Sequence, residues 1–108
     1  MSYDVRLTEG AEADVERRLM ELADRSPKAA ERLNDGFEQA LIRLRDFPLS
    51  CGPAYEADAF PEPLRHVLFW GDPRRKYRAV FVVRGETVVV LAVRAPGEKP
   101  ILPEDVEL

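Results

Sequence analysis

The sequence has 108 residues and a formal net charge of −4 at pH 7. That length predicts a single domain over residues 1–108 with a modest core, and 45% hydrophobic with 33% charged residues is typical of a globular protein. The acidic balance argues against unselective binding to duplex DNA, which depends on the number of phosphates neutralised. No apolar run approaches the roughly 18 residues of a membrane-spanning helix, so we expect no membrane association.

The first residues and the cysteine content bear on the compartment. Residues 1–5 lead directly into a strand pattern, without the basic start and apolar core of a signal peptide. Cys51 is the only cysteine, so no internal disulfide can form. We therefore expect a cytoplasmic protein.

A strand and two helices are predicted in the first half. Alternating apolar residues over 3–7 indicate a strand with one buried face, and from Ala11 the apolar spacing changes to that of a helix. Ser26 followed by Pro27 marks the start of a second helix, which Pro48 ends. Gly36, inside this helix, is interpreted as a tolerated cost of about 1 kcal/mol relative to alanine.

The second half is predicted to be a sheet. Residues 48–63 include four prolines and read as an irregular connection, with Tyr55 and Phe60 as its expected anchors. Residues 64–70, 77–84 and 87–94 follow as successive antiparallel strands. The apolar run Val88 to Leu91 is typical of a central strand covered on both faces. The order along the chain is thus β-α-α-β-β-β.

Positive charge is concentrated in this second half. Residues 60–100 contain 8 Lys and Arg against 4 Asp and Glu, whereas residues 101–108 contain only 3 acidic charges and are expected to form a flexible tail. Three strand arginines and a basic hairpin tip could meet in a concave cationic patch, beside aromatic side chains suited to stacking on RNA bases. The patch residues are Arg65, Arg78 and Arg94, with Arg74, Arg75, Lys76, Trp70 and Tyr77 as contacts for RNA or another target. The alternative is that these arginines are ordinary solvated residues of a sheet face.

The sequence gives little support for acid-base catalysis, nucleophilic catalysis, metal binding or cofactor binding. His66 could transfer protons, but it alternates in register with Leu64 and Leu68, which favours a structural, partly buried role. Cys51 has no recognisable partner that would activate a thiolate. The acidic residues show no metal-ligand spacing and no glycine-rich phosphate loop follows a strand, so we expect neither a metal nor a cofactor.

The ordered pieces of the sequence resemble the RelE/ParE superfamily of type II toxin-antitoxin toxins. The resemblance extends from about Tyr3 to Arg94 and rests on residues 3–8 with Ala11 and Asp14, Leu41 and Leu44 before Pro48, residues 63–65, residues 77–81, and residues 88–93. It implies an α+β fold in which two N-terminal helices pack on a curved antiparallel sheet of about four strands. It also implies a cognate antitoxin that binds and neutralises the toxin in a hetero-oligomer.

The resemblance leaves two targets open. RelE-like members cleave messenger RNA on the ribosome, and in that case Arg65 and Arg78 would hold the scissile phosphate with help from Arg94. ParE-like members inhibit DNA gyrase without a recognised catalytic centre. After the last predicted strand this chain has Ala-Pro-Gly-Glu, at 95–98, where RelE-like toxins place a histidine, tyrosine or arginine.

The leading hypothesis is therefore a ParE-like toxin that inhibits growth by binding gyrase, with a role in plasmid stabilisation. One alternative is a RelE-like ribosome-dependent endoribonuclease. The other is a detoxified relative that only binds proteins.

Overall fold

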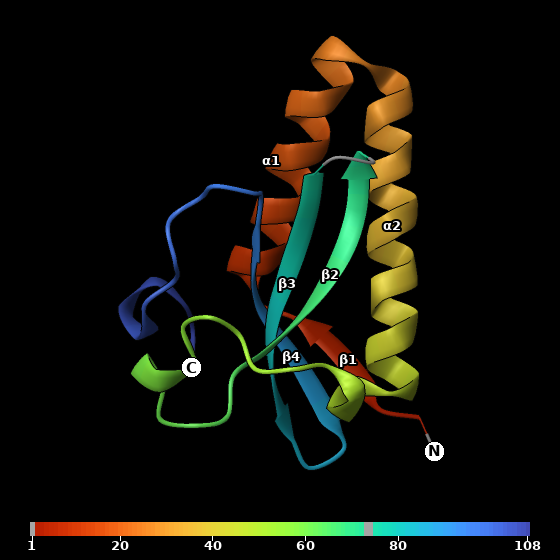
Figure 1. Ribbon diagram of the computed structural model, residues 1–108. Helices are drawn as coiled ribbons and strands as arrows, with labels where there is room; N and C mark the ends of the chain where they lie inside the picture. The colour runs from red at the N-terminus through yellow and green to blue at the C-terminus, as the bar shows by residue number, and fades with distance from the viewer. Residues whose placement is uncertain (1, 73–74) are drawn as a thin grey trace.

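The computed structural model describes residues 2–72 and 75–108, and the side chains of all of these except 71, 72 and 75. Two helices cover one face of a four-stranded sheet (Figure 1). The elements are β1 (Asp4–Leu7), α1 (Glu9–Arg25), α2 (Pro27–Asp46), β2 (Arg65–Asp72), β3 (Arg75–Arg84) and β4 (Thr87–Arg94), with short 3-10 turns at Pro48–Ser50, Ala57–Ala59 and Pro103–Asp105. The predicted order β-α-α-β-β-β is confirmed.

The predicted start of the second helix is confirmed, and the first helix begins at Glu9, two residues before Ala11. The Thr8 hydroxyl accepts a hydrogen bond from the Ala11 N–H at 3.1 Å and caps α1. Ser26 caps α2 by accepting from the Ala29 N–H at 3.2 Å, and Pro27 occupies the first turn, where its missing N–H costs nothing. Ser26 is both the C-cap of α1 and the N-cap of α2, so it fixes the tight turn that folds α2 back along α1. No helix in the described part of the chain is both long and apolar enough to cross a bilayer.

The sheet is mixed, whereas the sequence predicted an antiparallel one. Its strand order is β1-β4-β3-β2, with β2, β3 and β4 antiparallel as expected. β1 pairs with β4 in parallel, from Asp4 opposite Thr87 to Leu7 opposite Val90. The long connection from β1 through the helical hairpin and back allows this parallel pairing, which a tight hairpin does not.

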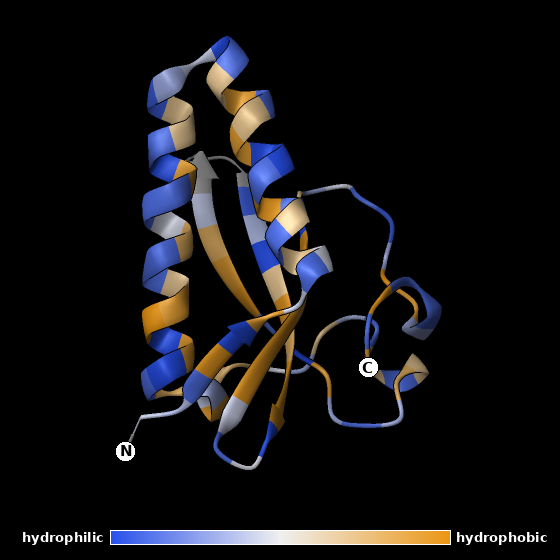
Figure 2. Ribbon diagram, turned by 180° about the vertical axis from the view of Figure 1, so that it is seen from behind, coloured by the Kyte–Doolittle hydropathy of each residue, from blue (hydrophilic) through white to orange (hydrophobic). Residues whose placement is uncertain are grey.

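The central position of β4 explains its continuous apolar run. One core cluster fills the space between helices and sheet and includes Val88, Val90 and Val93. A second cluster lies on the other face, which we call the open face, where Leu91 and Ala92 pack with Leu64 and Ile101. Apolar residues occupy the helix sides that face the strands (Figure 2). β4 is therefore buried on both sides, as predicted.

Irregular segments cover the lower part of the open face. Phe60, an expected anchor, is buried in the second cluster, but Tyr55 is 77% exposed and is no core anchor. Ile101, at the start of the segment predicted as a flexible tail, is fully buried, and a 3-10 turn follows it. The part of the open face that these segments leave uncovered contains the pocket described below.

Gly36 lies against the backbone of β2, so close packing requires a glycine at this position of α2. A Cβ atom built on Gly36 would overlap the backbone carbonyl of Trp70 in β2, far inside van der Waals distance. The interpretation of simple tolerance was wrong because sequence periodicity does not show how closely a helix approaches a strand. Glycine at this position lets α2 approach the end of β2.

Replacing Gly36 with alanine is expected to destabilise the fold by about 1–3 kcal/mol, because α2 or β2 must move to admit the methyl group. Gly10→Ala is the matched control, since Gly10 is also helical but its nearest neighbour is the Thr8 hydroxyl at 3.8 Å. That variant should be neutral or gain up to about 1 kcal/mol from helix propensity. Urea unfolding measures both, and equal stability of the two variants would contradict the packing argument.

Candidate functional site

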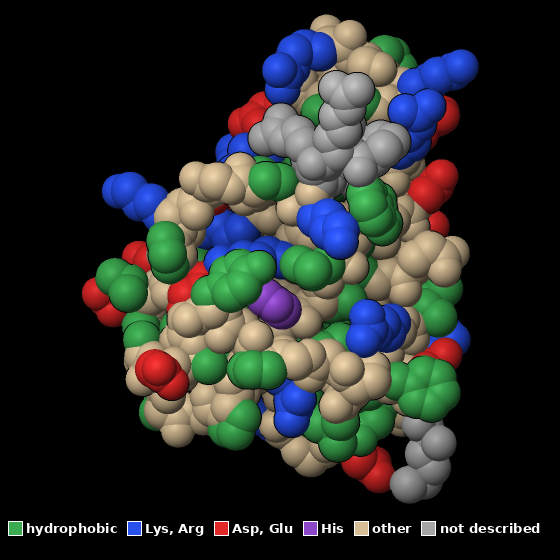
Figure 3. All heavy atoms as spheres, in the orientation of Figure 1, with side chains coloured by type: hydrophobic (Ala, Val, Ile, Leu, Met, Phe, Trp, Pro, Cys, Tyr) green, Lys and Arg blue, Asp and Glu red, His purple; other side chains and the backbone are tan. Residues whose placement is uncertain are grey.

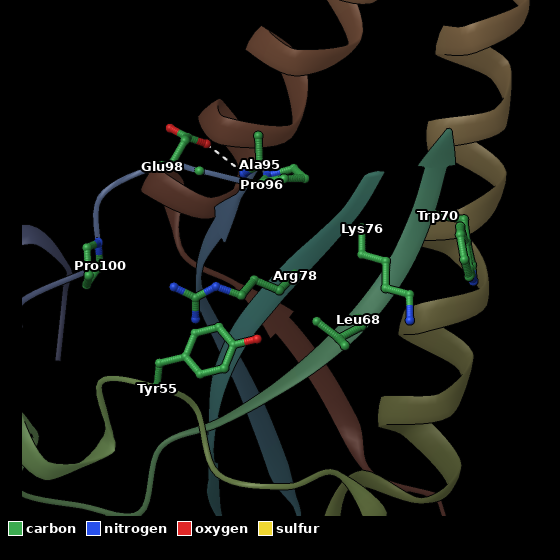
Figure 4. A pocket seen from close by; sticks show the side chains of 10 residues that line it. Tyr55, Leu68, Trp70, Lys76, Arg78, Ala95, Pro96, Glu98 and Pro100 are labelled. Carbon is green, nitrogen blue, oxygen red and sulfur yellow. Dashed lines mark hydrogen bonds between the residues drawn. The ribbon is translucent and has the colours of Figure 1, made fainter. Parts of the chain in front are cut away.

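The upper part of the open face contains a pocket of about 450 Å³. It is formed by Tyr55 from the irregular connection, by Leu68, Trp70, Lys76 and Arg78 from the β2–β3 hairpin, and by the loop 95–100 after β4. Figure 3 shows hydrophobic and cationic side chains gathered over this face, and Figure 4 shows the pocket residues themselves. We refer to it as the open-face pocket.

Arg78 lies at the centre of the pocket wall and forms a buried ion pair. Its guanidinium donates two hydrogen bonds to Glu56, one of them to Oε1 at 2.8 Å, and both side chains are almost entirely buried. Glu56 Oε2 also accepts the Ile101 N–H at 2.9 Å. One carboxylate thus connects the irregular connection, β3 and the C-terminal segment.

The protonation state of Glu56 follows from these contacts. Burial alone would raise the pKa of the carboxyl, but the hydrogen bonds from Arg78 and from the Ile101 N–H, together with the charge of Arg78, lower that pKa below its usual 4.5. Glu56 is therefore ionised at neutral pH. Its negative charge neutralises the positive charge of Arg78 inside the fold.

Aromatic groups complete the environment of Arg78. The Tyr55 ring lies 5.0 Å from the Arg78 guanidinium carbon, a cation-π distance, and meets the His66 ring edge-on with centroids 4.8 Å apart. Burial, and then the charge of Arg78, lower the pKa of His66, while Glu56 opposes them. His66 Nδ1 is buried with no hydrogen-bond partner among the described residues. The imidazole is accordingly neutral at pH 7.

The predicted arginine triad does not converge. Cross-strand partners share a face of a sheet, and Arg65 pairs with Phe81 of the helix-side core, whereas Arg78 pairs with Leu68 on the open face. Arg65 Nη1 donates to the Cys51 carbonyl at 2.6 Å. The two arginines therefore lie on opposite faces.

Arg94 is held by α1. It is the cross-strand partner of Arg78, but its Nη1 lies 3.4 Å from Asp14 Oδ2. The same carboxylate oxygen accepts the Val93 N–H at 3.0 Å, so Asp14 fastens α1 to the end of β4. Arg94 thus has a structural partner of opposite charge.

The residues predicted to contact RNA or another target divide into three groups. Trp70 is 52% exposed on the pocket rim with Lys76 Nζ 5.0 Å from its ring centre. Tyr77 is buried and stacks on Phe69 in the helix-side core, so it cannot receive a base, contrary to the sequence prediction. Arg74 and the side chain of Arg75 lie outside the described part of the structure.

Two further candidates show no activation. Cys51 is buried, and burial raises the pKa of its thiol, so the thiolate is disfavoured. In the described part of the chain, no three His, Cys, Asp or Glu side chains are grouped so as to hold a metal ion. The buried thiol of Cys51 is therefore a poor nucleophile.

Sequence reasoning missed the roles of Glu56 and Glu98. Glu56 lies in the irregular connection, where no periodicity assigns a face. Glu98 accepts the Ala95 N–H at 2.6 Å and forms an ion pair with Arg18 of α1, which holds the loop at the pocket rim (Figure 4). The one sequence signal for these roles is that each glutamate lies in a segment outside the helices and strands, where a carboxylate can bind a strand or helix cation.

Known proteins share this architecture. The structure titled "Chromosomal ParDE TA system from P. aeruginosa" superposes with a TM-score of 0.65 at 17% identity, covering 86% of this chain and 95% of that chain. The family described as "ParE toxin of type II toxin-antitoxin system, parDE" matches residues 5–99. No curated protein matches the sequence.

The superposition shows that the helical hairpin on one face of a four-stranded sheet is a fold that this chain shares with that structure. Because the family match extends over nearly the whole chain, the protein belongs to the ParE toxin family of type II toxin-antitoxin systems. The resemblance seen in the sequence is confirmed.

The Glu56–Arg78 pair predicts a specific pH dependence of stability. The pKa of Glu56 is lower in the fold than its usual 4.5, so its contribution is complete above that pH and is lost as the pH falls through the folded-state value. Between about pH 7 and 3, Glu56→Gln should lose less of its unfolding free energy than the wild type.

Glu62→Gln is the matched control, because Glu62 pairs with Arg84 in a more exposed ion pair that contributes little to stability. Urea unfolding at each pH measures the difference. A Glu56→Gln profile parallel to that of the wild type would show that the buried pair does not carry this stability.

Proposed function

We propose that the protein arrests growth by binding a protein target, DNA gyrase, and not by cleaving RNA. In this proposal a cognate antitoxin binds and neutralises it in the cytoplasm, and the pair stabilises the plasmid or chromosomal segment that encodes it. The family assignment supports a toxin, and the placement of Arg65 and Arg78 on opposite faces of the sheet carries the choice of mechanism.

Phosphate cleavage requires cations that reach the same phosphate. Donors that stabilise a developing charge must lie about 3 Å from the atom that bears it. Arg65 and Arg78 are separated by the sheet itself, so they cannot meet this condition together. Arg78 and Arg94 share the open face in register, but Glu56 and Asp14 already neutralise them.

The exposed groups at the pocket suit a protein partner. Trp70 and Leu68 are 52% and 43% exposed, and Tyr55 is more exposed than either. Large aromatic side chains are enriched at the centres of protein interfaces, where one of them can supply much of the binding energy. Exposed apolar groups of this kind favour burial against another protein.

Two observations support an antitoxin partner. The superposed structure is titled as a ParDE toxin-antitoxin system, and this chain belongs to the toxin family of such systems. The pocket between α2 and β2, lined by Ala40, Val67 and Phe69 among others, offers an apolar groove for an amphipathic segment. Co-expression with the cognate antitoxin should therefore abolish growth arrest.

Purified protein should inhibit gyrase-dependent DNA supercoiling and leave ribosome-bound messenger RNA intact. Trp70→Ala should weaken the inhibition by about tenfold or more if Trp70 anchors the interface. Phe47→Ala is a matched control, since Phe47 is another exposed aromatic, at the end of α2, and lies outside the pocket.

The two assays separate the alternatives. Cleavage of ribosome-bound message that is lost in Arg78→Ala would favour the endoribonuclease. Tight antitoxin binding without growth arrest or inhibition would identify a detoxified relative.

A further inference from the structure

The open-face pocket contains the elements of a site for single-stranded RNA. Arg78 and Lys76 supply guanidinium and ammonium donors, and Trp70 and Tyr55 supply exposed rings at the rim. Proteins bind single strands by combining a cationic groove with aromatic rings on which bases stack. A volume of about 450 Å³ is sufficient for a nucleotide-sized group.

Glu56 cancels the charge that such a site needs. A guanidinium binds phosphate best through two parallel N–H donors, and Glu56 occupies both terminal nitrogens of Arg78. The carboxylate is held in place by the Ile101 N–H and is 3% exposed, so solvent ions do not displace it readily. A phosphate that enters the pocket therefore finds the Arg78 charge already neutralised and is repelled by the Glu56 carboxylate.

We propose that Glu56 is a specificity-determining residue that masks a latent site for the phosphates of single-stranded RNA in the open-face pocket. The buried pair keeps Arg78 from binding phosphate and leaves the aromatic rim for a protein partner. Loss of the Glu56 charge, with the guanidinium retained, converts the pocket into an RNA site. The inference concerns RNA binding alone, so its test is independent of whether gyrase is the target.

The test is fluorescence anisotropy of a labelled single-stranded RNA oligonucleotide with the wild type and Glu56→Gln. The glutamine side chain has nearly the same shape as glutamate without the charge. The variant should bind the RNA about tenfold more tightly at low salt, an advantage that declines as salt rises because phosphate contacts release counterions. The RNA should also raise the melting temperature of Glu56→Gln and not that of the wild type.

Two variants identify the cause of any gain. Glu62→Gln removes one negative charge and frees Arg84 at a more exposed site, so it controls for net charge and should bind RNA as weakly as the wild type. Glu56→Gln/Arg78→Gln lacks the cation and should lose the gain. If the Glu62 variant gains equally, or the double variant retains the gain, the effect is general electrostatics and the proposal is overturned.

Folding is checked by circular dichroism before binding. A folded Glu56→Gln with wild-type affinity for RNA overturns the proposal. Should Glu56→Gln fail to fold in buffer alone, it is compared with the wild type and with Glu62→Gln in a stabilising osmolyte such as sucrose. Equal affinities of the three folded proteins for RNA then overturn the proposal.

Discussion

The buried ion pair between Glu56 and Arg78 organises the open face of the sheet. It joins three segments that are distant in sequence, since Glu56 belongs to the irregular connection, Arg78 to β3, and the Ile101 N–H to the C-terminal segment. Removing one member of such a pair leaves an uncompensated buried charge and costs about 3–5 kcal/mol. The pocket, the packing of the last residues and the charge of the site all depend on this contact.

Two further acidic residues form ion pairs with strand arginines. Asp14 binds Arg94 and the Val93 N–H, and Glu62 binds Arg84. Three arginines of the second half of the chain, Arg78, Arg84 and Arg94, are thus paired with carboxylates, whereas Arg65 donates to the Cys51 carbonyl. These pairs explain how a locally basic sheet belongs to an acidic protein.

Local patterns in the sequence predicted most of the fold. The Ser26 cap and the apolar run of β4 act through neighbours in the chain, so local sequence alone revealed them. Parallel pairing of β1 and close packing at Gly36 depend on contacts between distant segments. Periodicity has no information about such contacts.

The site was less predictable for the same reason. The sequence correctly placed Arg65 and Arg78 on neighbouring strands. The pairing register of β2 and β3 decides whether the two side chains share a face, and the sequence of the connecting turn does not specify that register. Tyr77 follows from that register as a core residue. Glu56 lies where the chain has no repeating structure, so its pairing with Arg78 could be seen only in three dimensions.

Arg78 thus serves the structure through Glu56 and, in the proposed mechanism, takes no part in phosphate chemistry. The decisive measurement is growth after induced expression of Glu56→Gln/Arg78→Gln, with soluble yield and antitoxin binding confirming the fold. We expect this variant still to arrest growth, because a neutral pair replaces an ion pair whose role is internal. Loss of arrest in a variant that folds and binds antitoxin would show that Arg78 acts on the target directly.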